Sequence, residues 1–267
     1  RHGARAVNLF KCAFATVLLA LMLLVTGGWA EISGVPGMDV ALVALSGVFG
    51  LTMGDTALFA AVNHIGAHRS LLLQTTAPIF AVALAWPLGE RLTVSQSVGS
   101  LVILAGVVVV LTGDGSDDVN RPRRRAMGIA AGLLAAFGQG AGVVIAKAGM
   151  NSLPIVPATF IRLGVGAAGL VVIALLTSTL GRTVMAFRDR GTLPRLVTAS
   201  FFGTFLAMLL MMAGVAWAPA SIAAVLLATP PVFSLIVESI VARRWPSVRG
   251  MIGTVIAVAG VALLVTV

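Results

Sequence analysis

HIGAHRSLLLQTTAPIFAVALAW, residues 64–86, has a counterpart later in the chain, WAPASIAAVLLATPPVFSLIVES at residues 217–239. Three positions are identical at one constant spacing: Thr76, Pro78 and Phe80 in the first stretch, and Thr229, Pro231 and Phe233 in the second. Further matches at nearly the same spacing are Lys11 with Arg162 upstream, and Gly99 and Gly106 with Gly253 and Gly260 downstream. Shared Pro, Thr and Gly positions over this length of chain indicate an internal repeat.

The composition places these stretches in a membrane. Of the 267 residues, 59% are hydrophobic and 10% are charged, and the mean hydropathy is +1.07, whereas soluble domains carry about 25% charged residues. A membrane protein with many spans fits this composition, and a soluble domain does not. The net charge of +9 is interpreted as a signal for membrane orientation rather than for nucleic-acid binding, because Lys and Arg in loops determine on which side of the membrane a loop lies. The single cysteine, Cys12, excludes an intramolecular disulfide and a multi-cysteine metal site.

A spanning helix needs about 20 mostly apolar residues. The sequence therefore predicts an all-α polytopic membrane protein with nine such helices, at residues 7–27, 40–62, 69–88, 95–113, 126–149, 157–179, 195–217, 220–241 and 248–267. The first segment also fits a signal peptide, because basic residues precede its apolar core. Its match to the sixth segment argues against cleavage.

The repeat predicts how these helices are organised. Segments one to four match segments six to nine, so the fifth has no partner, and we expect a tenth helix before Arg1 in the intact protein. Two five-helix repeats then occupy residues 1–113 and 126–267, with residues 114–125 as a polar linker. Because five is odd, the second repeat enters the membrane from the opposite side. Inverted repeats of this kind are typical of transporters that bind substrate near the midplane.

The stretch from Gly54 to Gly113 resembles the EamA-type repeat of the drug/metabolite transporter superfamily. The resemblance rests on a mid-helix proline, a Gly89-Glu90-Arg91 turn, and a final helix with two well-separated glycines. The second repeat keeps the proline and the glycines but has Ala242-Arg243-Arg244 at the turn. The resemblance covers the whole chain. It implies a secondary carrier for amino acids, other metabolites, nucleotide sugars or drugs, and it does not name the substrate.

The two prolines are candidates for shaping a substrate cavity. Pro78 and Pro231 lack a backbone N–H and clash with the preceding turn. In lipid, irregular backbone persists only where protein or water lines it, so each proline predicts either a cavity-lining kink or a packing kink without ligand contact. Thr75, Thr76 and Thr229 lie beside them, and their hydroxyls either bind substrate or bond back to their own helix.

Two polar side chains lie within predicted spans. Asp55 lies near the middle of the second segment, where a carboxylate is costly and marks a candidate functional site. We expect it to bind a proton or a substrate ammonium group, with a salt bridge or a helix cap as the alternative. Gln139, in FGQGAG of the fifth segment, is a second candidate because the glycines around it permit close approach.

Two basic side chains, Lys11 and Arg162, lie within the first and sixth segments. They are predicted to attract an anionic group toward each mouth of the transport path, or alternatively to extend to lipid headgroups. All other lysines and arginines except Arg91 and Lys147 fall on the side of the N-terminus, which the positive-inside rule makes cytoplasmic. The family resemblance instead implies that both chain ends are cytoplasmic.

The sequence thus predicts a secondary active transporter that moves a small metabolite (an amino acid, a related metabolite or a drug) by alternating access, in the export direction. We expect no enzymatic activity, no cofactor and no metal. The expected partners are a small-molecule substrate and the lipid bilayer, with proton coupling through Asp55; nucleic acid is not expected, and a homodimer is left open. The expected location is a prokaryotic plasma (inner) membrane.

Two alternatives to a transporter are a membrane subunit that acts only with a partner and a membrane-embedded lipid-modifying enzyme. Such an enzyme needs a cluster of His, Asp or Ser side chains at one membrane face. With three histidines in the whole chain, the sequence offers no convincing cluster of this kind.

Overall fold

The chain forms two compact units that each combine early and late segments. The computed structural model describes residues 4–85, 93–112, 122–178, 193–217 and 247–265, together with residues 181, 191, 230, 233, 236–237 and 239–240. Unit 1 consists of Arg1–Phe59 and Ala141–Trp217, and unit 2 consists of Ala60–Gly140 and Ala218–Val267. The compact units therefore do not coincide with the predicted repeats, because each unit takes part of both.

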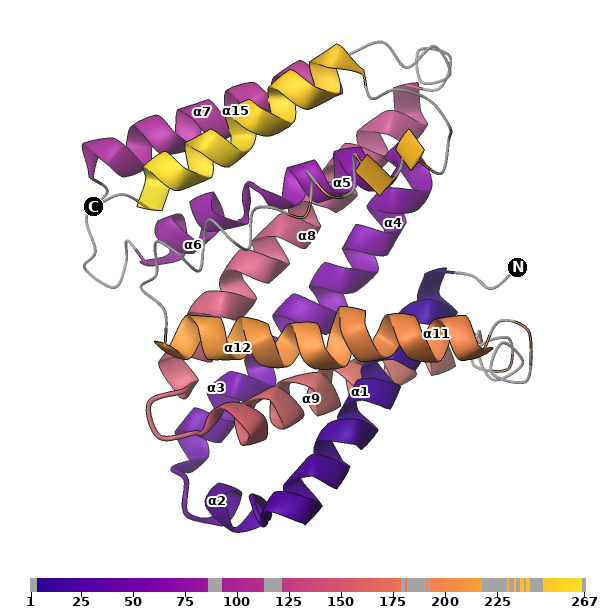
Figure 1. Cartoon of the computed structure of the whole chain (residues 1–267), viewed down its shortest axis with the longest axis vertical. Helices are drawn as coiled ribbons and strands as arrows, with labels where there is room; N and C mark the ends of the chain where they lie inside the picture. The colour runs from indigo at the N-terminus through magenta and orange to yellow at the C-terminus, as the bar shows by residue number, and fades with distance from the viewer. Residues whose placement is uncertain are drawn as a thin grey trace. The chain divides into compact units, whose positions relative to one another are not determined.

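The described elements are helical throughout (Figure 1). In unit 1 they are α1 (Ala4–Thr26), α2 (Trp29–Ser33), α3 (Gly37–Gly47), η1 (Val48–Asp55), α9 (Ile155–Leu176), α11 (Leu193–Ser200), η3 (Phe201–Leu206) and α12 (Ala207–Trp217). In unit 2 they are α5 (Ala67–Gln74), α6 (Ala77–Ala85), α7 (Val94–Leu111) and α15 (Val248–Val265). Helices α4 (Thr56–Ile65) and α8 (Pro122–Gly149) contribute residues to both units.

The predicted fold class is confirmed, since the described residues form helices and contain no strand. Five helical stretches are long and apolar enough to cross a membrane: Ala6–Thr26, Gly37–Ile65, Pro122–Gly149, Ile155–Leu176 and Leu193–Gly214. Two shorter apolar helices, Ser97–Leu111 and Val248–Leu263, cover the cores of two further predicted segments. Most of the predicted segment 220–241 falls outside the described residues.

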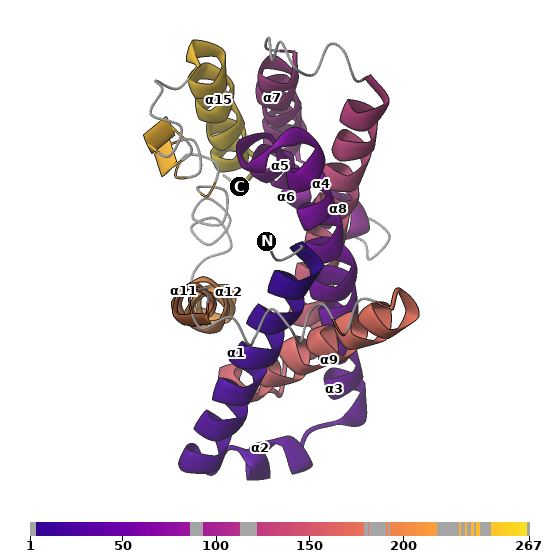
Figure 2. The ribbon, with the colours of Figure 1, turned by 90° about the vertical axis from the view of Figure 1, so that its right-hand side faces the viewer.

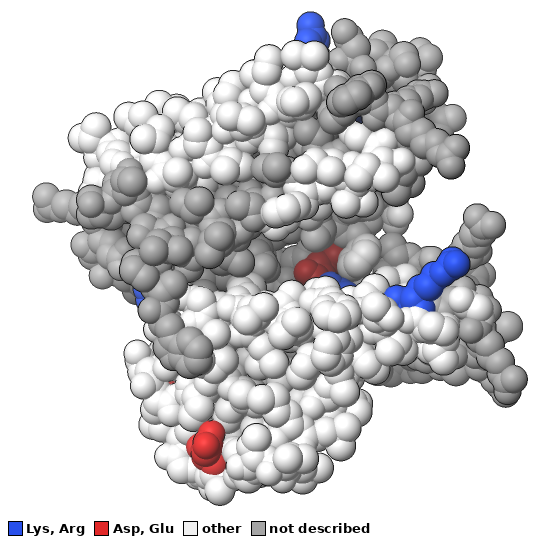
Figure 3. All heavy atoms as spheres, viewed as in Figure 1, with Lys and Arg blue, Asp and Glu red and all other residues white. Residues whose placement is uncertain are grey.

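The surface of the described helices is apolar, as a lipid-facing surface must be. Leu101, in the middle of α7, and Val255, in the middle of α15, are both 67% exposed. Figure 3 shows the same property on one face, where charged groups of the described residues form only a few isolated spots. Large exposed apolar surfaces mark contact with a membrane or another protein, and the length of the helices here favours the membrane.

In unit 1, the packing of α1 against α9 is made by one buried stripe on each helix. The stripe of α1 recurs every three or four residues, which is the period of one helix face. The buried residues are Leu9, Cys12, Ala15 and Leu19 on α1, and Leu163, Ala167, Leu170 and Ala174 on α9. The first and sixth segments, which match in sequence, therefore pack directly against each other.

In unit 2, α7 and α15 lie side by side (Figure 2) and meet through glycines. A Cβ atom added to Gly106 would lie 2.6 Å from the carbonyl oxygen of Gly253, and one added to Gly260 would lie 2.9 Å from the carbonyl oxygen of Gly99. Gly99, the first glycine of the pair in α7, thus meets Gly260, the second in α15, and Gly106 meets Gly253. The two helices are therefore antiparallel. Antiparallel packing of matched helices is what inverted repeats require.

We predict that Gly106→Ala lowers the thermal stability of the protein in detergent. The new Cβ would lie 2.5 Å from the backbone nitrogen of Ala257, and backbone atoms make way only if the two helices separate. Overpacking of this kind costs about 1–3 kcal/mol. Thermal unfolding of the purified variants measures the effect. Gly214→Ala is the matched control, because a Cβ there meets nothing within 4 Å; equal melting temperatures for the two variants would contradict the packing argument.

Candidate functional site

Two spanning helices widen into π-helical segments at equivalent positions of the repeats. The segments η1 and η3 begin at Val48 and Phe201, and these residues are separated by the same spacing as Thr76 and Thr229. Wide turns of this type are rare and are frequent at functional sites. Sequence reasoning missed both of them, because their residues look like the middle of an ordinary apolar span.

Asp55 ends η1, and its carboxylate forms an ion pair with Lys11 of α1. Lys11 Nζ lies 2.5 Å from Asp55 Oδ2, and the two side chains are 22% and 15% exposed. Lys11 Nζ also lies 5.3 Å from the centroid of the Phe59 ring, within the range of a cation–π interaction. Of the roles predicted for Asp55, the salt bridge is the one seen in this conformation. Lys11 is its partner, which the sequence did not indicate.

Arg162 of α9 is completely buried, with 0% of its surface exposed. Its Nη1 donates to the carbonyl oxygen of Gly142 at 2.9 Å and to Oγ of Ser46 at 3.3 Å. Its Nε and Nη2 have no hydrogen-bond partner among the described residues. The guanidinium group therefore points into unit 1, and the predicted alternative of an extension to lipid headgroups does not describe this side chain.

A glycine holds the backbone of Arg162 close to α3. A Cβ atom added to Gly47 would lie 2.3 Å from the carbonyl oxygen of Arg162, so a larger residue would push α9 away. The η1 segment that ends at Asp55 packs against α9, and Thr52 Oγ1 of η1 donates to the carbonyl oxygen of Gly166 at 3.2 Å. The structure thus gathers two cations and one carboxylate from α1, α9 and η1. The sequence identified each residue but not their grouping.

The predicted threonine and proline candidates of the first repeat lie in unit 2, around a break between α5 and α6. Thr75 Oγ1 donates to the carbonyl oxygen of Leu72, and Thr76 Oγ1 donates to that of Leu73, both at 2.7 Å. Of the two roles considered for these hydroxyls, this conformation shows bonding back to the preceding helix. Pro78 lies in the first turn of α6, where its missing N–H leaves no helical bond unmade.

Gln139 is partly buried in α8, beside a close contact between α8 and α6. A Cβ atom added to the adjacent Gly140 would lie 2.5 Å from the carbonyl oxygen of Ala77, and the rings of Phe80 and Phe137 meet edge to face at 5.7 Å. The glycines around Gln139 are therefore used for helix packing. The remaining predicted site residues, Thr229 and Pro231, lie outside the described residues.

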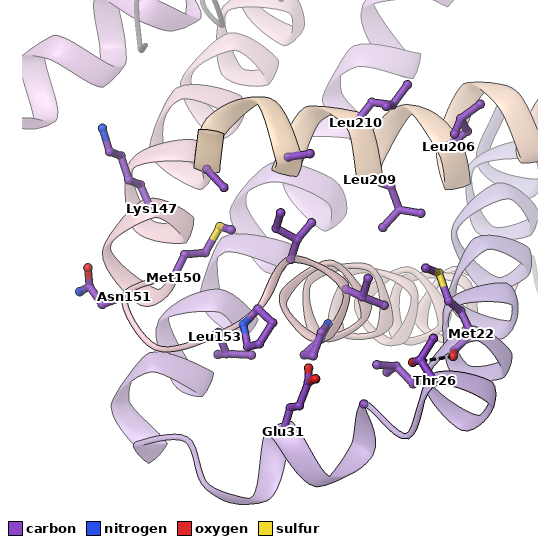
Figure 4. A pocket seen from close by; sticks show the side chains of 18 residues that line it. Met22, Thr26, Glu31, Lys147, Met150, Asn151, Leu153, Leu206, Leu209 and Leu210 are labelled. Atoms are coloured by element: carbon purple, nitrogen blue, oxygen red, sulfur yellow. Dashed lines mark hydrogen bonds between the residues drawn. The ribbon is translucent and has the colours of Figure 1, made fainter. Parts of the chain in front are cut away.

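Unit 1 also contains a pocket of about 990 Å³, shown in Figure 4. It lies between the end of α1, the start of α9 and the η3–α12 helix, and its wall is mostly apolar, with Leu206, Leu209 and Leu210 on one side. Glu31 and Lys147 supply charges to its lining. None of the site residues predicted from the sequence lines this pocket, and the sequence carried no signal for it.

Comparison with known proteins identifies the class. The model of the EamA-like transporter family matches residues 1–112 and 126–266. The chain belongs to the EamA-like transporter family. The resemblance inferred from the repeat is thereby confirmed, and membership points to a protein that moves solutes across a membrane rather than to an enzyme.

Two relatives of this EamA-like protein show what it is similar to. A "Probable terminal-alkyne amino-acid exporter" of Streptantibioticus cattleyicolor is 30% identical over 115 residues, which cover 43% of this chain and 37% of the relative. A solved structure described as "Crystal structure of protein" is 20% identical with a TM-score of 0.67, over 97% of this chain and 87% of that one. The match spans little more than a third of the exporter, and the solved structure supports the fold alone.

We predict that Lys11→Met and Asp55→Asn each lower the stability of this EamA-like protein. The double variant is expected to lose less stability than the sum of the two single losses. Either single change leaves a charge of low exposure without its partner, whereas the double change removes both charges. The coupling energy from thermal or denaturant unfolding is expected to be about 0.5–3 kcal/mol. Lys147→Met combined with Asp55→Asn is the control cycle and is expected to give additive effects, because Lys147 forms no ion pair with Asp55.

Proposed function

We propose that this EamA-like protein is a secondary active transporter that exports a small metabolite of the amino-acid type by alternating access. Family membership and the relationship to an exporter support this proposal. The single observation that carries it is the cluster of Lys11, Asp55 and Arg162 within apolar helices, because ionisable groups at such depth are costly and mark substrate or ion pathways.

Asp55 is proposed as the residue that couples transport to a proton gradient. Among the described residues, Lys11 pairs with its carboxylate, and Cys12 and Arg162 lie on the neighbouring helices α1 and α9. Protonation of Asp55 removes its negative charge and with it the ion pair that ties α1 to η1. Proton binding then changes how strongly two spanning segments of unit 1 are held together. Such a change biases one conformation over another.

The repeat boundaries and the location complete the proposal. We propose two inverted repeats, residues 1–113 and 126–267, joined by residues 114–125. The two separate regions matched by the family model and the antiparallel packing of α7 against α15 support this division. The proposed location is a prokaryotic plasma (inner) membrane. Thr75, Thr76, Pro78, Gln139, Thr229 and Pro231 remain candidates for lining the substrate path in other conformations of the cycle.

We predict saturable, pH-gradient-dependent export of an amino acid by the purified protein in proteoliposomes. Flux is measured for a labelled panel of amino acids, nucleosides and cationic drugs, with and without an imposed pH gradient. Asp55→Asn is expected to abolish the dependence on the gradient while exchange of internal for external substrate continues. Asp39→Asn makes the same chemical change outside the cluster and is expected to behave as wild type.

Each outcome of this experiment separates the alternatives. Coupling that is unchanged in Asp55→Asn removes the role proposed for Asp55 but leaves the transporter. Absence of flux for every compound, from protein shown to be folded, contradicts autonomous transport and favours a membrane subunit that needs a partner.

A further inference from the structure

The guanidinium group of Arg162 has one edge bound by the protein and another edge with no partner in the part of the chain that the structure describes. Nη1 is held by the carbonyl oxygen of Gly142 and Oγ of Ser46. The remaining donors, Nε and Nη2, have no hydrogen-bond partner among the described residues, although the side chain is 0% exposed. Nε–H and Nη2–H lie on the same side of the planar group, and together they form the fork that binds both oxygens of a carboxylate.

The charges of the cluster do not balance. Lys11 and Arg162 each carry a positive charge, and Asp55 supplies the negative charge of the cluster. Asp55 is bound directly to Lys11, so the charge of Arg162 lacks a direct counter-ion among the described residues. An uncompensated charge inside apolar surroundings is strongly unfavourable. A single additional carboxylate at the free edge would satisfy both donors and neutralise the cluster.

We propose that the Nε–Nη2 edge of Arg162 is the binding site for the carboxylate of the transported substrate, an inference that rests on the proposed function of this chain as a transporter. Among the described residues, the alternative source of a carboxylate in the cluster is Asp55 itself. Moving Asp55 to Arg162 would leave Lys11 without its ion-pair partner and would not change the net charge of the cluster. A carboxylate brought by the substrate avoids both costs.

This assignment defines a substrate class. The substrate must carry an anionic group with two oxygens for the paired donors and one negative charge for the cluster, and a carboxylate meets both requirements. An ammonium group on the substrate is not required, because Asp55, the carboxylate of the cluster, is already engaged by Lys11. Amino acids, 2-oxo acids and N-acylated amino acids with the same side chain are therefore expected to bind alike, whereas the corresponding amines are expected not to bind.

Binding at a fully buried edge requires movement of the helices around it. Arg162 Nη1 is fixed to α3 and α8 through Ser46 and Gly142, so the guanidinium group itself is held in place. Access is then gained when α9, η1 or α1 shifts relative to the others, which is the motion that alternating access supplies. The site is closed in this conformation and open in another.

The test uses ligand-induced stabilisation of the purified protein, which does not depend on transport. The probes share one carbon skeleton: leucine, 4-methyl-2-oxopentanoate, which lacks the ammonium group, and 3-methylbutylamine, which lacks the carboxylate. Binding to the folded state raises the melting temperature, and tighter binding raises it more at a given ligand concentration. Leucine and the oxo acid are therefore expected to raise it in a concentration-dependent manner. The amine is expected to leave it unchanged.

Substitutions of Arg162 test whether the stabilisation by carboxylates comes from this side chain. Arg162→Gln is expected to weaken binding of both carboxylates roughly tenfold or more, since a charge-assisted pair of hydrogen bonds is lost. Arg162→Lys keeps the charge but not the paired donors, so an intermediate loss is expected, and it serves as the second variant if the glutamine variant does not fold. Arg123→Gln removes an exposed arginine at the start of α8 and is expected to bind as wild type does.

Three outcomes would overturn the proposal. Wild-type affinity for the carboxylates in folded Arg162→Gln or Arg162→Lys would show that they bind elsewhere. Stabilisation by the amine to the same degree as by leucine would show that the carboxylate is not recognised. Stabilisation by carboxylates only after Asp55→Asn would assign the edge to Asp55. Failure of flux in proteoliposomes alongside carboxylate binding that depends on Arg162 would instead remove the transport function and leave the site.

Discussion

A bilayer has no water in its hydrocarbon core, so each polar group of a spanning segment must find its partner within the protein. Several polar groups of the described helices follow that rule. The hydroxyls of Thr75 and Thr76 bond back to the preceding helix, and Lys11 and Asp55 neutralise each other. Arg162 departs from it, because only its Nη1 is bound by the described residues. The buried groups Asn8 Nδ2, Thr56 Oγ1 and Gln74 Oε1 also lack a hydrogen-bond partner among the described residues, but Arg162 is the charged side chain of this set. In unit 1, a charged side chain whose donors are only partly paired among the described residues therefore lies on a helix that packs directly against the helix of Lys11.

Close approach of backbones supplies most of the specificity of the packing. Lipid tails are as apolar as leucine, so helices in a bilayer associate through tight contact of small residues rather than through a hydrophobic driving force. Gly106 and Gly253 bring α7 and α15 together, and Gly47 brings α3 onto the backbone of Arg162. Matched helices of the two repeats pack on each other in both units. A compact unit must then draw on both repeats, which explains why the units and the sequence repeats divide the chain differently.

The sequence predicted the fold well because the fold depends on features that can be read along the chain without knowing which residues are in contact. Length and hydropathy determine where spans lie, and a recurring Thr, Pro and Gly pattern is visible without any structure. The ion pair between Lys11 and Asp55 joins residues far apart in the chain, and no local pattern in an apolar helix encodes such a partner. The π-helical segments were also missed, since Val48–Asp55 and Phe201–Leu206 differ from neighbouring turns in hydrogen bonding and not in composition. Arg162 was recognised as a candidate, but its burial depends on Gly47 and Gly142, which read as ordinary packing residues.

The two repeats carry equivalent cations within their spans, but the carboxylate of Asp55 has no equivalent in the second repeat. Lys11 matches Arg162, whereas Asp55, at the spacing that relates Thr76 to Thr229, corresponds to Met208, an apolar residue packed against the core of unit 1. Inverted repeats exchange roles between the inward-open and outward-open conformations of a transporter. If the two repeats were fully equivalent, these two conformations would have the same free energy. Asp55 breaks that symmetry, because it satisfies Lys11 and leaves Arg162 without an equivalent partner. In the proposed transport cycle, the balance between the conformations depends on the charge of Asp55 and on the anion that meets Arg162. A proton would change the first and a carboxylate substrate would supply the second, and this is the physical basis that the proposal offers for coupling between them.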